Sequence, residues 1–143
     1  MVSTLLIAWC LLGLTVAIHA AGLSALLSSM SSALPDKRFW PVTWQLLGVA
    51  WKLVLLHLAE IAVWALFYWL ARCLPDAESS LYFSGVTYTT VGYGDLVLPK
   101  EWRLLGPVEG LTGILMCGLS TGFFFAVVSK FLIANPQRRK TDP

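Results

Sequence analysis

The chain has 143 residues, of which 57% are hydrophobic and only 13% are charged. Soluble domains carry roughly 25% charged residues, so a chain this apolar lacks the polar surface to stay in water and is expected in a lipid bilayer. The formal net charge of +2 is too small to indicate nucleic-acid binding. Cys10, Cys73 and Cys117 lie in separate apolar segments without pair spacing, which indicates neither disulfides nor a cysteine metal site.

The first apolar stretch, Thr4 to Leu27, is long enough for a transmembrane helix. A signal peptide is the alternative, because Ile18-His19-Ala20 loosely resembles a cleavage site. No Lys or Arg precedes the stretch, and the apolar run continues past that site, which favours an uncleaved helix. We therefore expect a membrane helix within residues 1–34 and a cytoplasmic linker at 35–45.

A second span is expected at residues 46–74, because aromatic residues typical of membrane interfaces flank it and Pro75 stops it. Residues 77–89 form an apolar segment too short to cross a bilayer. Asp76 and Glu78 at its front are suited to a helix N-terminus. A third span is expected at residues 104–134, rich in small residues that let helices approach closely, and a tail at 135–143.

Between the short segment and the third span, residues 89–95 read Thr-Thr-Val-Gly-Tyr-Gly-Asp. Successive backbone carbonyls can face one axis if alternate residues adopt backbone angles that glycine tolerates. Gly92 and Gly94 supply this freedom, and Val91 and Tyr93 are expected to pack outward. Stacked carbonyl rings can replace the hydration shell of a potassium ion, to which the Thr90 hydroxyl adds an oxygen.

These seven residues resemble the selectivity-filter signature of potassium channels at every position. Over about residues 46–134 the chain resembles bacterial channels of the two-transmembrane pore-domain (ion channel) family, with an additional N-terminal helix. The resemblance implies an all-α integral membrane protein with three transmembrane helices, a re-entrant pore helix at 77–89 and a filter loop at 90–95. It implies K⁺ binding at Thr90, Val91, Gly92 and Tyr93, with no other cofactor, and lipid as the surrounding partner. One chain supplies one strip of carbonyls, so a closed ring requires a homotetramer.

The resemblance also assigns supporting residues around the filter, namely Thr89, Gly94, Asp95, Tyr82 and Val86. Val86 stands where certain bacterial relatives have a glutamate that pairs with the filter aspartate, so Asp95 needs another partner. Tyr82 stands where many relatives have a tryptophan that bonds this aspartate. We therefore expect a Tyr82–Asp95 contact, within one subunit or between two.

In the third span, Gly118 falls where inner helices of this family often carry a hinge glycine. Close helix packing would explain the same glycine equally well. Helical spacing places Gly122 and Ala126 on a face toward the central cavity, and Phe123 or Lys130 would narrow the mouth of that cavity.

Four ionisable residues, His19, His57, Glu60 and Glu109, lie within the apolar spans, where an unpaired charge is costly. Antiparallel spans place His19 and Glu60 at similar depth, and His57 lies one turn before Glu60. We expect a His19–Glu60 or His57–Glu60 hydrogen bond that docks the extra helix. Alternatively, Glu60 is protonated and bonded to a hydroxyl or water, or the cluster senses pH. Glu109 is expected either to brace the filter through a group such as Thr87 or to reach the interface.

Basic residues set the orientation. Lys37, Arg38 and Lys52 border the same membrane face as Lys130 and residues 138–140, which predicts a cytoplasmic C-terminus and an external N-terminus. The compact form indicates a bacterial inner membrane. The leading interpretation is a passive potassium-selective channel. The alternative is a non-conducting or weakly selective cation-channel subunit. No residue set resembles a hydrolase or transferase, so an enzyme is not expected.

Overall fold

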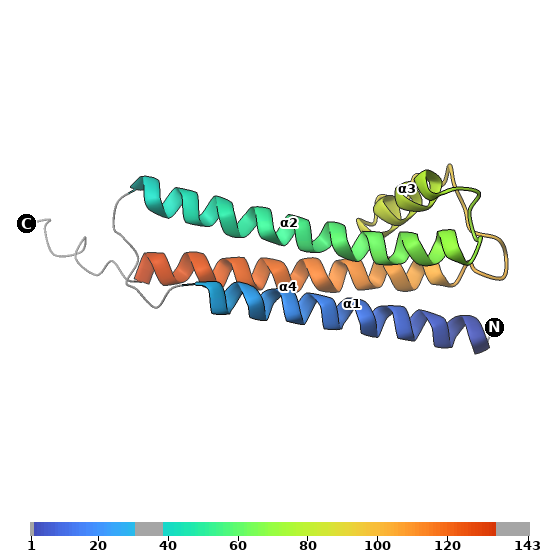
Figure 1. Ribbon diagram of the computed structural model, residues 1–143, viewed down its shortest axis with the longest axis horizontal. Helices are drawn as coiled ribbons and strands as arrows, with labels where there is room; N and C mark the ends of the chain where they lie inside the picture. The colour runs from blue at the N-terminus through green and yellow to red at the C-terminus, as the bar shows by residue number, and fades with distance from the viewer. Residues whose placement is uncertain (1, 31–38, 134–143) are drawn as a thin grey trace, which may run out of the picture.

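The computed structural model describes residues 2–30 and 39–133 and places four helices in them. They are α1 (Val2–Ser29), α2 (Phe39–Leu70), α3 (Ala77–Tyr88) and α4 (Leu105–Ile133). The three longest, α1, α2 and α4, are long and apolar enough to cross a membrane. They lie side by side along the long axis, with the short α3 at one end (Figure 1). The described residues contain no strand, which confirms the all-α architecture.

Helix α2 is shifted toward the N-terminus relative to the span expected at 46–74. It begins at Phe39, and Pro41 lies in its first turn, where the missing N–H leaves no helical bond unmade. It ends at Leu70 because Arg72 adopts a left-handed φ of 54°. The N–H of Cys73 then bonds the Tyr68 carbonyl (2.9 Å) and that of Arg72 bonds the Trp69 carbonyl (3.0 Å), closing the helix.

The start and end of α3 fix the segment that follows it. Asp76 caps the helix by accepting a hydrogen bond from the backbone N–H of Ser79 at 2.7 Å. The Ser79 hydroxyl donates to the other Asp76 oxygen at 3.0 Å. At the far end, the N–H of Thr89 bonds the Gly85 carbonyl at 3.1 Å. The helix therefore ends directly before the Thr-Val-Gly-Tyr-Gly motif.

Helix α1 contacts α4 as well as α2, and lies alongside α4 in Figure 1. The additional helix therefore packs against both of these helices. At one end Leu26 of α1, Val49 of α2 and Val127 of α4 share an apolar cluster. At the other end, Ala8 packs in a cluster with Trp64 of α2 and Leu105 of α4.

Five of the basic residues that predict the orientation lie outside the described residues, namely Lys37, Arg38, Arg138, Arg139 and Lys140. Within the described part, Lys52 is on α2 and Lys130 is in the last turn of α4. The Thr4 hydroxyl bonds the Glu101 carbonyl at 3.3 Å, which places the start of α1 beside the segment that follows the motif.

Candidate functional site

The backbone of the motif alternates in handedness. Thr90, Gly92 and Gly94 have φ angles of 63°, 53° and 77°, whereas Val91 and Tyr93 between them are not in the positive-φ region. Such alternation cancels the twist of the chain, so it is the pattern that lets successive carbonyls face one side. Gly92 and Gly94 were expected to provide this freedom. The left-handed Thr90 was not foreseen, because a side chain there costs roughly 1–2 kcal/mol.

Hydrogen bonds to the end of α3 hold the motif in this shape. The N–H of Thr90 bonds the Thr87 carbonyl at 2.9 Å, and that of Gly92 bonds the Val86 carbonyl at 3.0 Å. Val86 therefore acts through its main-chain oxygen, which its side-chain identity gave no reason to expect. The Thr89 hydroxyl donates back to the Gly85 carbonyl at 2.7 Å. The short helix and the motif form one continuous hydrogen-bonded unit.

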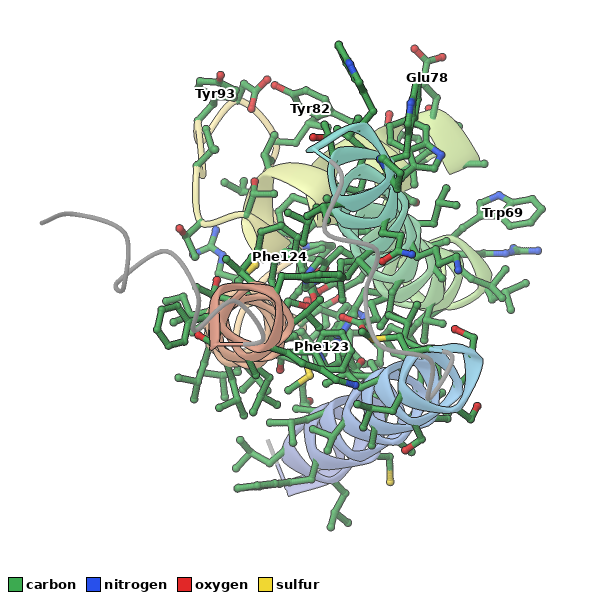
Figure 2. All side chains as sticks on the ribbon, turned by 90° about the vertical axis from the view of Figure 1, so that its left-hand side faces the viewer. Trp69, Glu78, Tyr82, Tyr93, Phe123 and Phe124 are labelled. Carbon is green, nitrogen blue, oxygen red and sulfur yellow. The ribbon has the colours of Figure 1, made fainter. Side chains whose placement is uncertain are left out.

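Two side chains of the motif are largely exposed in the single chain. Val91 is 52% exposed and Tyr93 is 72% exposed. In Figure 2, Tyr93 lies at the outer edge of its loop, away from the helices. The outward packing expected for both residues therefore has no partner within one chain.

The contact expected between Tyr82 and Asp95 is present, and it forms within one chain. The Tyr82 hydroxyl donates to Asp95 Oδ2 at 2.7 Å, and the N–H of Leu96 bonds Oδ1 at 3.1 Å. Tyr82 points from α3 toward the loop that carries Tyr93 (Figure 2). The bond from Tyr82 holds the pKa of Asp95 below its ordinary value, and the pKa of Tyr82 is raised by the same bond.

Glu109 of α4 lies fully buried behind α3 and bonds two of the other helices. Tyr68 of α2 donates its hydroxyl to Glu109 Oε2 at 2.7 Å. Ser84 of α3 has its Oγ at 2.6 Å from Glu109 Oε1 and at 2.9 Å from the Ile61 carbonyl. The expected bond to α3 is therefore made, but to Ser84 rather than to Thr87. Because its oxygens are held inside the protein, Glu109 does not reach the interface.

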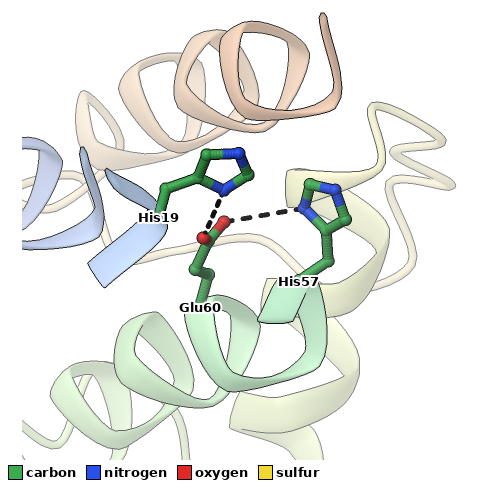
Figure 3. A group of neighbouring side chains, drawn as sticks. All are labelled: His19, His57 and Glu60. Carbon is green, nitrogen blue, oxygen red and sulfur yellow. Dashed lines mark hydrogen bonds and ion pairs between the residues drawn. The ribbon is translucent and has the colours of Figure 1, made fainter. Parts of the chain in front are cut away.

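A second polar cluster joins all four helices, and Figure 3 shows three of its side chains, His19, His57 and Glu60. His19 Nδ1 of α1 lies 2.7 Å from Glu60 Oε1 of α2, and His57 Nδ1 lies 3.6 Å from Glu60 Oε2. The Tyr88 hydroxyl at the end of α3 donates to Glu60 Oε2, and His57 Nδ1 lies 3.1 Å from that hydroxyl. Ser120 Oγ of α4 is 3.4 Å from His19 Nε2.

Of the two hydrogen bonds that the sequence left as alternatives, the one between His19 and Glu60 is made, whereas His57 lies at an ion-pair distance from Glu60 that is too long for a hydrogen bond. The structure adds Tyr88, which the sequence reasoning did not single out. The position of Tyr88 could have indicated its role, because it is a polar aromatic residue at the inner end of the short helix, at the depth of Glu60.

One side of α4 is left open by the rest of the chain. Gly118, Gly122 and Ala126 are exposed on it, and a side chain at either glycine would meet nothing within 4 Å. Close packing inside one chain is therefore not the reason for Gly118. Phe123 was expected to narrow the mouth of the cavity, and this expectation is corrected. Phe123 and Phe124, both labelled in Figure 2, pack against the apolar cluster of Leu26, Val49, Leu53 and Val127.

Gly113, on the buried side of α4, has a different role. A side chain there would collide with the Tyr88 carbonyl, and its Cβ would lie 2.8 Å from the Tyr88 carbonyl carbon. The absence of a side chain lets the end of α3 rest directly on α4.

The comparisons with known proteins bear on this arrangement. Neither the curated proteins nor the solved structures gave a match. A family model described as ion channel matches residues 42–130, which include α3, the motif, nearly all of α4 and most of α2. With three apolar helices of spanning length, the chain is an integral membrane protein, and it belongs to the ion-channel family.

Proposed function

We propose that the protein forms a potassium-selective pore through which K⁺ moves passively down its gradient. The alternating handedness at Thr90, Gly92 and Gly94, within Thr-Val-Gly-Tyr-Gly, is the observation that carries this proposal. The carbonyls of residues 90–93, with the Thr90 hydroxyl, would replace the water around K⁺. Conduction of this kind needs no cofactor and no chemical reaction.

The working unit would be a homotetramer, because each chain contributes one strip of the four that surround an ion. The exposure of Val91 and Tyr93 supports this, since neighbouring chains would supply the cover that one chain lacks. The open side of α4, with Gly118, Gly122 and Ala126, would then line the water-filled cavity. Gly118 would serve as the hinge of the inner helix.

The motif would face the outside of the cell and the C-terminus the cytoplasm, as the basic residues indicate. The end of α3 supports a cation pathway independently. A helix C-terminus carries a partial negative charge, and α3 ends at Tyr88, next to the filter. In this arrangement the Asp95 carboxylate would lie at the outer entrance. Among the described residues, its hydrogen bonds come from the Tyr82 hydroxyl and the Leu96 N–H, and none comes from a basic side chain.

The proposal is tested with the purified full-length protein in liposomes under opposed potassium and sodium gradients. A potassium-selective pore gives a reversal potential close to the potassium equilibrium potential. A reversal potential near zero would show a weakly selective cation channel, and no current in membranes that contain the protein would show a non-conducting subunit. Gly92→Ala is the matched negative variant, because its positive φ of 53° disfavours any side chain.

A further inference from the structure

Three side chains from two helices present their ligand atoms to one point inside the membrane part of the protein. Each of His19, His57 and Glu60 offers one ligand atom, an imidazole nitrogen or a carboxylate oxygen, and the three atoms lie within 4.8 Å of one another. His19 and Glu60 are buried, whereas His57 is 19% exposed and gives the cluster its open side. Two imidazole nitrogens and a carboxylate are the ligand types that zinc binds in proteins.

Each histidine lies close to the carboxylate at a distance that suits a shared metal ion. Ligands at the usual zinc bond lengths lie roughly 3.3 Å apart. His57 Nδ1 lies 3.6 Å from Glu60 Oε2, and His19 Nδ1 lies 2.7 Å from Glu60 Oε1. Both pairs come within about half an ångström of that separation, a change that side-chain rotation can supply. Both rings already turn Nδ1 toward the same carboxylate (Figure 3).

Tyr88 offers the fourth ligand. Its hydroxyl oxygen lies 3.1 Å from His57 Nδ1 and is hydrogen-bonded to Glu60 Oε2. Net charge favours its use. A divalent ion held by two neutral imidazoles, one carboxylate and one phenolate has no net charge, whereas without the phenolate a positive charge would remain among apolar side chains. Binding would release the Tyr88 phenol proton to solvent and move the proton of each imidazole from Nδ1, which faces Glu60 or Tyr88, to Nε2.

The surroundings suit a metal ligand as well. Histidines that bind metals donate their other ring N–H to an oxygen, which fixes the ring. Ser120 Oγ of α4 lies 3.4 Å from His19 Nε2 and is positioned to accept that proton. The ligands come from α1, α2 and α3, and the oxygen that orients His19 comes from α4.

From this arrangement we infer that His19, His57, Glu60 and Tyr88 form a binding site for a divalent transition metal of the zinc type. This departs from the sequence-based expectation that potassium is the only ion bound. Magnesium and calcium do not suit the site, because they require more oxygen ligands. A bound ion would fasten α1 to α2 and to the end of α3, two residues before Thr90.

The test uses the full-length protein in detergent, freed of any polyhistidine tag and equilibrated with micromolar zinc chloride. Metal analysis after removal of free zinc is expected to give about one zinc ion per chain, as a single tetrahedral site requires. Magnesium chloride at the same concentration is expected to leave no bound metal. Cobalt(II), added to the unaltered protein, is expected to give the intense visible absorption of a four-coordinate ion.

The matched variants separate this site from other zinc ligands. His57→Gln is expected to lose zinc, and because His57 is the more exposed of the two histidines, its replacement disturbs packing less than that of His19. Tyr88→Phe is expected to weaken zinc binding about tenfold or more. Cys10→Ser with Cys117→Ser, which removes two thiols outside the cluster, should bind as the unaltered protein does. Absence of zinc from the unaltered protein, a six-coordinate cobalt spectrum, or equal binding by His57→Gln would overturn the inference.

Discussion

Tyr82 and Asp95 link the short helix to the outer end of the motif through one exposed hydrogen bond. Tyr82→Phe keeps the ring and removes only the hydroxyl. We expect the variant to assemble normally but to lose potassium current faster during sustained recording, because Asp95 is no longer tied to α3. Single-channel records in planar bilayers measure this, and unchanged open times would contradict a supporting role for the bond.

The same bond predicts a dependence on acid. Tyr82 holds the pKa of Asp95 below its ordinary value, so the stabilisation is present at neutral pH and is lost as pH falls through the lowered pKa. In Tyr82→Phe the pKa of Asp95 moves back toward the ordinary value, so Asp95 is protonated at a higher pH. The acid midpoint of potassium flux from liposomes should therefore rise in Tyr82→Phe, whereas Asp95→Asn should lack that transition. An identical midpoint in Tyr82→Phe and the unaltered protein would rule this out.

The protonation state of Glu109 can be predicted by counting the protons available to its hydrogen bonds. Ser84 has one hydroxyl proton but lies within bonding distance of both the Ile61 carbonyl and Glu109 Oε1. All three bonds are satisfied if Glu109 is a neutral acid that donates to Ser84, which in turn donates to Ile61, while Tyr68 donates to Glu109 Oε2. The hydrogen-bond pattern therefore favours the neutral form.

Glu109→Gln reproduces this pattern, because its amide donates to Ser84 and its carbonyl accepts from Tyr68. We expect it to unfold at nearly the same temperature as the unaltered protein in detergent. Glu109→Ala leaves buried hydroxyls without that partner and should cost about 1–3 kcal/mol. If Gln were as destabilising as Ala, Glu109 would have to be ionised.

The sequence predicted the ionisable residues of these clusters but not all of the residues that form hydrogen bonds with them. Rarity of ionisable residues in apolar spans was enough to single out His19, His57, Glu60 and Glu109. Tyr88 and Ser84 could not be chosen in the same way, because they lie in a short helix whose rotation about its axis is set by packing. The left-handed conformation of Thr90 was missed for a different reason, since it is imposed by hydrogen bonds to the end of α3 and not by the residue's own preference.

At the scale of helices, the apolar composition predicts the number of membrane spans, whereas the capping conformations decide at which residue α2 ends and α3 begins. The apolar run continues to Leu74, yet α2 stops at Leu70 because Arg72 takes a left-handed conformation. Ordinarily glycine marks that position, so the sequence carried no visible stop before Pro75. Asp76, by contrast, is a typical N-cap residue, and α3 begins at the expected residue.

Two glycines of α4 provide a matched pair for testing how this helix packs. Gly113→Ala places a methyl group against the Tyr88 carbonyl, so α3 must shift and the motif with it. Gly118→Ala meets nothing within 4 Å in the same chain. We expect Gly113→Ala to lower the thermal unfolding temperature by several degrees, as a loss of about 1–3 kcal/mol would. Gly118→Ala should change the unfolding temperature little, and equal effects of the two variants would contradict the close approach seen at Gly113.

For the whole molecule, the position of α1 changes how the pore can be coupled to the rest of the chain. Because α1 contacts α4 as well as α2, it lies against the helix proposed to line the pore. His19 reaches Glu60 of α2 and Ser120 of α4 from a single position on α1. Movement of α4 relative to α2 would therefore disturb contacts of α1. Helix α1, which a minimal pore does not need, is therefore positioned to influence gating.

The number of chains that share one pore can be counted by mixing variants. Gly92→Ala places a side chain at a positive φ in the proposed filter, so one altered strip should block the ring. If unaltered and altered chains assemble randomly in equal amounts, a tetramer leaves about one sixteenth of the pores free of altered chains, whereas a dimer leaves about one quarter. Potassium flux per protein in liposomes made from co-expressed chains measures this fraction. Flux that falls only by half would mean that each chain conducts alone, and the exposed faces of Val91 and Tyr93 would then need a partner other than this chain.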